Sequence, residues 1–206
     1  MRLFAISPFS QASRQEILRF LATLPPSLVV LPGRSDNTPT PRQIQRVIHR
    51  GSLVFAEGAP RSNGCPAFII TRQKLKKMPS QVFARSPKAA DMDALAAILP
   101  QRTIRVGKRS VTFLICGELI AFNPNGSTKH RRDLHYDIIV NPAHTTMGHW
   151  NHLGEKLARL SKRSIAVYVT NNDHDRHITS DVRIYKDGEL MKRHRGVNIA
   201  WSKCVI

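Results

Sequence analysis

The residues best suited to chemistry lie at the end of an apolar run, where Cys116 is followed by Gly117 and Glu118. The run itself, 111–115, indicates a buried strand, and α/β proteins place their sites where such strands end. A thiol attacks only as its thiolate, and an ordinary pKa of about 8.5 leaves it mostly protonated at neutral pH. The pattern therefore predicts a cysteine nucleophile that needs a cation or a base beside it; the alternative is a small buried side chain.

Histidines offer a second kind of chemistry. His149 and His152 are three residues apart, so both could face one metal ion from the same side of a helix. The sequence has no H-E-x-x-H pattern, and we predict no metal and no cofactor. His144 follows the next apolar run, 137–141, and is a candidate for lining a substrate pocket together with Gly117.

The elements that must position these residues follow from hydrophobic periodicity. Apolar or β-branched runs predict strands at 3–6, 27–31, 53–56, 67–71, 103–106, 111–116, 136–141 and 165–171. Helical spacing predicts helices at 11–24, 41–51, 91–99 and 150–162. Ser13 with Glu16 has the pattern of a capping box, and Asp187-Gly188 predicts a hairpin turn. The alternation predicts one α/β domain, residues 1–206, with a mixed central sheet in which 113–116 and 137–141 are neighbouring interior strands.

The composition is that of a globular domain with a strong basic excess. Hydrophobic residues make up 41% and charged residues 22%, so the chain can bury a core without staples. Lys and Arg number 32 against 14 Asp and Glu, a formal net charge of +18 that favours polyanions or anionic substrates. Three widely spaced cysteines predict no disulfide framework, and no apolar run reaches the roughly 20 residues of a membrane span. We expect a cytoplasmic protein with no signal peptide.

The order of several short motifs resembles the nitrilase, or carbon–nitrogen hydrolase, superfamily. MRLFAISPF and LVVLPG are similar to its first two strands, KKMPS (residues 76–80) to its lysine motif and FLICGEL to its nucleophile strand. DIIVNPAH, the segment 149–172 and RIYKDGEL resemble the strand, helix and hairpin that follow. The resemblance covers most of the chain and implies an α/β fold, the α-β-β-α layered sandwich with mixed sheets.

The resemblance also implies roles for individual residues. Cys116 would be the nucleophile that attacks an amide or nitrile carbon, and Lys76 the cation that stabilises the oxyanion, with Lys74 as the second candidate. Glu118 would be a secondary, structural carboxylate. Ammonia or an amine would leave from a thioester intermediate.

The general base of the family is missing from its usual place. The second strand of the family ends in Pro-Glu, whereas this chain has Gly33 after the proline. Asp36, three residues on, is the first candidate for a substitute base, and Glu57 at the end of the next strand is a weaker one. General-base catalysis contributes about 10²–10⁴-fold, so activity is expected to be weak unless one of them serves.

Two functions follow. The first is a cysteine-dependent, amidase- or nitrilase-like hydrolase of small-molecule non-peptide C–N bonds. The alternative is a catalytically inactive protein of the same fold that binds nucleic acid or an acidic partner through its basic surface. That surface would include Arg131, Arg132, Lys192, Arg193 and Arg195. A homodimer is an open alternative in either case.

Overall fold

The structure is a computed structural model that describes residues 1–8, 12–33, 37–58, 66–131, 134–144, 150–162, 164–171, 180–196 and 198–206. Within these residues the strands form two six-stranded sheets. The first runs in the order β12 (Ile199–Val205), β1 (Arg2–Pro8), β2 (Ser27–Leu31), β3 (Leu53–Glu57), β4 (Ala67–Ile70) and β5 (Leu75–Met78). The second runs in the order β11 (Glu189–Gly196), β10 (Ser180–Lys186), β9 (Ile165–Thr170), β8 (Ile138–Ala143), β7 (Arg109–Phe113) and β6 (Thr103–Val106).

Both sheets are mixed. In the first, β1, β2 and β3 are parallel neighbours, and the other pairs are antiparallel. In the second, β7, β8 and β9 are parallel, flanked by antiparallel hairpins at each edge. The carboxyl ends of the parallel strands in each sheet therefore deliver their following residues to one edge of that sheet, which is where α/β sites form.

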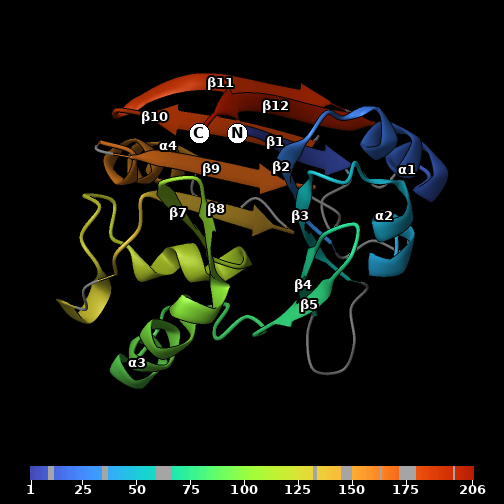
Figure 1. Cartoon of the computed structure of the whole chain (residues 1–206). Coiled ribbons are helices and arrows are strands. Elements are labelled where there is room, and N and C mark those ends of the chain that lie inside the picture. The colour runs from blue at the N-terminus through green and yellow to red at the C-terminus, as the bar shows by residue number, and fades with distance from the viewer. Residues whose placement is uncertain are drawn as a thin grey trace.

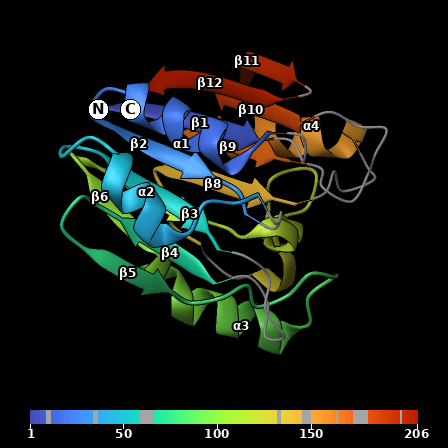
Figure 2. The same ribbon diagram turned by 90° about the vertical axis from the view of Figure 1, so that its right-hand side faces the viewer.

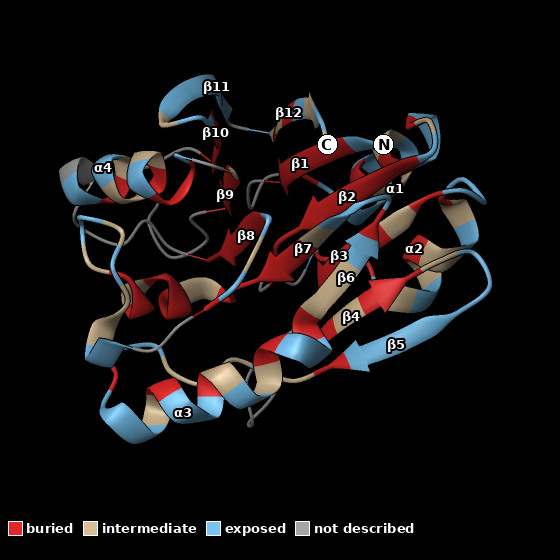
Figure 3. Cartoon of the chain, turned by 60° about the vertical axis from the view of Figure 1, so that its left-hand side comes forward, coloured by how far each residue is buried: buried red, intermediate tan, exposed pale blue. Residues whose placement is uncertain are grey.

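Four layers stack across the molecule (Figures 1 and 2). Helices α1 (Arg14–Thr23) and α2 (Pro41–Val47) cover the outer face of the first sheet, and α3 (Ala89–Ile98) and α4 (Trp150–Leu160) cover the second. Between the sheets lies a core of aliphatic side chains from both, joined by Phe55 and Phe113, whose stacked rings have centroids 4.4 Å apart. Figure 3 shows the buried central strands and the exposed β5 and β11 at the edges. The α-β-β-α sandwich with mixed sheets is confirmed.

Local sequence explains the helix starts. Ser13 accepts a hydrogen bond from the Glu16 amide while the Glu16 carboxylate accepts from the Ser13 amide, and Thr40 with Gln43 repeats this before α2. Each capping box satisfies two of the amides that a helix leaves unpaired at its first turn. The hairpin turn at Asp187-Gly188 also forms, with positive φ at both residues.

The structure differs from the sequence-based elements in several places. One central sheet was expected from periodicity, whereas two sheets form. The strand expected to end at Cys116 ends at Phe113, and Cys116 opens a short 3₁₀ helix, η2 (Cys116–Ala121), beyond it. Strands β5 and β12 were not predicted. The interior placement of the neighbouring strands β7 and β8 is confirmed. Among the described residues, no helix is long and apolar enough to cross a membrane.

Candidate active site

Cys116 lies just past the carboxyl end of β7 in a constrained backbone conformation. Its φ is +46°, in the left-handed region that residues with a Cβ rarely adopt. The buried amide of Asn141, on β8, donates to the carbonyls of Leu114 (2.6 Å) and Cys116 (3.0 Å), so the neighbouring strand fixes the turn on both sides of Ile115. Backbone strain held in this way tends to occur at functional sites, and here it sets the direction of the thiol.

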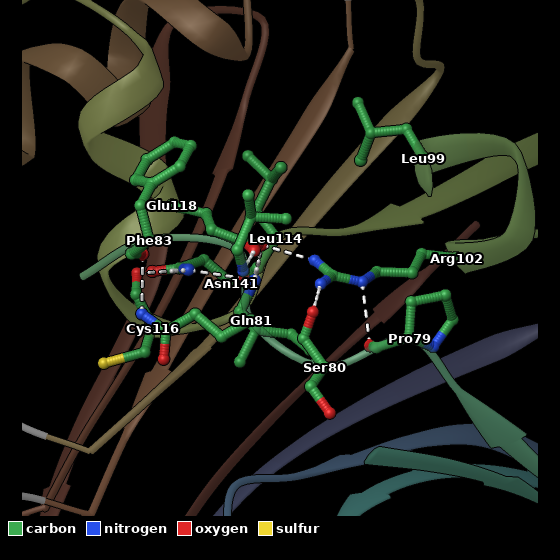
Figure 4. A network of polar contacts seen from close by, with 12 residues as sticks. Pro79, Ser80, Gln81, Phe83, Leu99, Arg102, Leu114, Cys116, Glu118 and Asn141 are labelled. Atoms are coloured by element: carbon green, nitrogen blue, oxygen red, sulfur yellow. Dashed lines mark hydrogen bonds and ion pairs between the residues drawn. The ribbon is translucent and has the colours of Figure 1, made fainter. Parts of the chain in front are cut away.

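The Glu118 side chain is held by an ion pair and by backbone amides. Its carboxylate accepts from Arg102 Nη1 (2.5 Å), from the Ile115 amide (2.8 Å) and from the Val82 amide (2.6 Å), and both charged side chains are fully buried. Burial raises the pKa of Glu118, while the Arg102 guanidinium and the two amides act against that rise. Figure 4 shows the Cys116 sulfur on the opposite side from this ion pair. The Glu118 carboxylate is thus occupied by Arg102 and two backbone amides.

Gly117 lies against the segment that follows β5. A Cβ on Gly117 would stand 2.7 Å from Ala84 Cα, which only a glycine avoids. Arg102 holds the same segment by donating to the carbonyls of Pro79 (3.0 Å) and Ser80. The positive φ of this turn falls on Cys116, and Gly117 allows a close approach of two backbones.

A buried histidine–glutamate pair forms next to the thiol. His144 follows β8 in the second sheet, and Glu57 ends β3 in the first. His144 Nε2 lies 2.8 Å from Glu57 Oε2, with the two residues 2% and 0% exposed. In the described part of the chain, His144 Nδ1 has no conventional hydrogen bond, and the His144 ring lies close enough to the Cys116 thiol to lower its pKa. The order thiol, imidazole, carboxylate is that of a catalytic triad.

The pKa values of Cys116 and His144 are both shifted by this arrangement. Burial raises the pKa of the Cys116 thiol, but hydrogen bonding to His144 and the charge of its ring outweigh burial, and the net pKa lies below its ordinary value. Burial acts to lower the pKa of His144, but the Glu57 charge and the hydrogen bond with Cys116 raise it to about 10. Both shifts favour a thiolate–imidazolium pair at neutral pH.

Gly33 makes room for the glutamate. Its amide donates to Glu57 Oε2 (3.3 Å), and its carbonyl accepts from Asn171 Nδ2 (2.7 Å). A Cβ at position 33 would lie 2.6 Å from Glu57 Cβ, inside any tolerable contact. The family resemblance expects the general base at the end of β2, where this chain has Gly33. A carboxylate from the neighbouring parallel strand β3 occupies that place.

The other predicted site residues lie elsewhere. Lys74 and Lys76 are exposed, Lys76 on the edge strand β5, and among the described residues no hydrogen bond or ion pair joins their side chains to Cys116, His144 or Glu57. Asp36 lies outside the described residues, as do Arg132, His149 and Cys65. No group of three metal-ligating side chains occurs within the described ranges.

The basic residues proposed for polyanion binding are spread over two regions. Arg131 is exposed at the end of η3 (Lys129–Arg131), and Lys192, Arg193 and Arg195 lie along the edge strand β11. Arg193 Nη2 and Arg195 Nε lie 3.0 and 3.5 Å from Asp181 Oδ2, so part of their charge is already compensated.

Sequence reasoning underrated the pair that the structure brings to the thiol. His144 was expected to line the pocket, and Glu57 was considered a weaker base than Asp36. The sequence does contain a signal for this pair. Glu57 ends the apolar run LVFAE and His144 ends DIIVNPAH, while Gly33, which ends the preceding strand, cannot supply a base. That they meet could not be known without the stacking of the two sheets.

The fold is that of the CN-hydrolase superfamily. A CN-hydrolase superfamily protein from Xanthomonas campestris, with an arsenic adduct in its active site, matches at a TM-score of 0.64 and 12% identity over 100% of this chain and 90% of its own. An amidase from Nesterenkonia sp. AN1, whose active-site cysteine added acrylamide, matches at 0.58 and 14% identity over 100% and 93%.

Larger enzymes contain the same fold as one part. A glutamine-dependent NAD⁺ synthetase from Cytophaga hutchinsonii matches at a TM-score of 0.58 and 13% identity, over 99% of this chain but 42% of its own. No family model and no curated protein sequence matches this chain. The likeness to these structures is one of fold.

Proposed function

We propose that this protein is a cysteine-dependent hydrolase of small-molecule C–N bonds, of the amidase type, in which His144 activates Cys116 and Glu57 orients His144. The observation that carries the proposal is the buried Glu57–His144 pair beside a thiol whose pKa it lowers. The amidases among the structural neighbours support an amide as substrate. Here the activating role that the family resemblance assigns to a glutamate passes to a histidine.

The reaction balances with these three residues. The proton of Cys116 moves to His144 Nδ1, and the sulfur bonds to the amide carbon. Collapse of the tetrahedral species breaks the C–N bond, and the proton on His144 goes to the leaving nitrogen, which departs as ammonia or an amine. Water, deprotonated by His144, then attacks the thioester and releases the acid and the thiol. Glu57 stabilises the imidazolium in both halves of the cycle.

Alkylation of the cysteines against pH tests the activated thiol. Iodoacetamide should modify Cys116 well below pH 9, because its thiolate is favoured by His144. Cys204 should react much more slowly than Cys116 near neutral pH and speed up as the pH approaches 11, because burial raises its pKa to about 11. We expect Cys65 to be slower than Cys116 as well. In His144→Ala the reactivity of Cys116 should shift to higher pH, whereas in His135→Ala, an exposed histidine, it should not.

Hydrolysis of an amide panel tests the activity itself. Cys116→Ala should abolish turnover, and His144→Ala should lower kcat by about 10²–10⁴, the contribution of a general base. Glu57→Gln should lose part of the same factor, and Lys76→Ala little. Activity should rise with pH through the lowered Cys116 pKa and fall near 10, where His144 deprotonates. A variant series in which Lys76→Ala costs more than His144→Ala would contradict the proposal; absence of turnover would favour the binding protein.

A further inference from the structure

A groove of about 350 Å³ opens at the end of the sandwich away from Cys116. It is lined by residues at the start of β1 and β9 and the end of β10 and β12, the edge opposite to the carboxyl ends that carry Glu57 and His144. Its base is the core between the sheets: Ile165 and Ile184 line it and are 2% and 1% exposed. A volume of this size is at the small end of ligand-binding pockets.

The walls of the groove are apolar and open to solvent. Met191 and Val205 line it and are 56% and 78% exposed, unusual values for large hydrophobic side chains. Cys204 also lines the groove and packs against the core between the sheets. Burial raises the pKa of its thiol to about 11 even though Lys192, Lys186 and Arg109 act to lower it. The interior of the groove is thus an apolar environment close to several cations.

The rim is cationic. Four of the lining residues are basic, Arg2, Lys186, Lys192 and Lys203, and none of the lining residues is acidic. In the strand register, Lys186 pairs with Ile165 and Lys192 pairs with Ile184. Side chains of directly paired residues leave a sheet on the same face, so both lysines start from the face that carries these two inward-facing isoleucines. One rim lysine has an acidic neighbour, Asp187 at 4.0 Å, and both members of that pair are exposed, where ion pairs contribute little.

We propose that this groove binds an anionic amphiphile, a carboxylate with a short alkyl chain. The chain would cover Met191, Cys204 and the exposed edge of the core, and the carboxylate would meet Lys186 and Lys192. A nucleic acid would contact the cations and leave the apolar floor of the groove exposed to water. A second copy of this chain would bring a like rim, and a net charge of +18, to the same place.

Protection of Cys204 is a direct readout. Sodium decanoate should slow modification of Cys204 by N-ethylmaleimide, with Cys116 in the same sample as the internal reference. Affinity should rise about fourfold for each methylene added from hexanoate to decanoate. Decyltrimethylammonium, which has the same chain and the opposite charge, should protect far less. Because the readout is a cysteine outside the proposed active site, it does not depend on amide turnover.

Variants separate the two halves of the recognition. Lys186→Gln and Lys192→Gln should each weaken decanoate binding about tenfold, as loss of a charged hydrogen-bond partner does, and Met191→Ser should weaken it without changing the charge preference. Lys76→Gln with Lys77→Gln, exposed on the distant β5, is the matched control and should change nothing.

Several results would overturn the proposal. These are equal protection by the cationic amphiphile, no protection by decanoate, and lysine variants that bind as the wild type does. Protection by an oligonucleotide or poly-glutamate but not by decanoate would assign the groove to an acidic polymer. Protection that grows with protein concentration alone would assign it to a second copy.

Discussion

At the scale of single residues, the proposed site depends on Gly33, which has no side chain. Gly33 stands where the family resemblance expects a glutamate, and taken alone it suggests a lost base. The structure gives the glycine another meaning, because the Glu57 side chain occupies the space that a side chain at 33 would need. The carboxylate is displaced by one strand, and it contacts His144.

Restoring the family residue should therefore damage the site. In Gly33→Glu the new Cβ would lie 2.6 Å from Glu57 Cβ and 2.7 Å from the Glu57 carbonyl oxygen, so the backbone must shift. We expect a loss of about 1–3 kcal/mol in the free energy of unfolding, typical of overpacking, and slower alkylation of Cys116 at pH 7. Gly154→Ala, in helix α4 with only ordinary contacts, is the control and should be neutral or stabilising. A faster thiol in Gly33→Glu would mean that position 33, and not Glu57, is the place of the base.

At the scale of elements, Cys116 is held by strands and turns that sequence patterns predict unequally well. Strands β7 and β8 were predictable because uninterrupted apolar runs indicate burial on both faces. The end of β7 was placed too late because Leu114 and Ile115 are apolar and buried although they lie outside the strand. Strand β12 was missed because its core-facing side is small, with Ala200 and Cys204, and gives no strong alternation.

The position of the 3₁₀ helix depends on contacts that no pattern reveals. Arg102, from the turn η1 (Leu99–Arg102) before β6, reaches Glu118 in η2 and the carbonyls after β5, and so joins three segments. The Glu57–His144 contact likewise links residues 87 apart, one in each sheet. Such contacts follow from how the two sheets stack, which short-range periodicity does not specify.

Breaking the buried ion pair should destabilise the fold without changing the chemistry of the thiol. Glu118→Gln leaves Arg102 charged and buried without its ion-pair partner. It also replaces one carboxylate oxygen, which accepts hydrogen bonds, with an NH₂ group that can only donate, although two backbone amides donate to this side chain. We expect the free energy of unfolding to fall by about 3–5 kcal/mol, measured by urea denaturation. Asp137→Asn, an exposed carboxylate bound by Ser110, should lose far less. Folded Glu118→Gln should keep the pH dependence of Cys116 alkylation, and a shift like that of Glu57→Gln would instead place Glu118 in the active site.

At the scale of the whole molecule, the charge is the property that the fold does not explain. Lys and Arg number 32 against 14 Asp and Glu, so most of the basic residues have no carboxylate available to pair with. Exposed basic residues occur on an edge strand of each sheet, Lys76 and Lys77 on β5 and Lys192, Arg193 and Arg195 on β11. Long-range attraction of polyanions follows from such a field whatever the site does.

Nucleic-acid binding should therefore be weak, non-specific and dependent on salt. The logarithm of affinity for duplex DNA should fall linearly with the logarithm of salt concentration, with a slope of about 0.9 for each phosphate that is neutralised. Replacing Lys192, Arg193 and Arg195 with Gln should reduce that slope by about 1–2, and not by the full three contacts, because Arg193 and Arg195 already contact the Asp181 carboxylate. The matched control replaces Lys74, Lys76 and Lys77 with Gln on the other edge. Filter binding at several salt concentrations measures both slopes. Equal losses in the two triple variants would indicate a diffuse charge effect without a preferred surface, and no binding at low salt would leave the excess charge without a polyanionic partner.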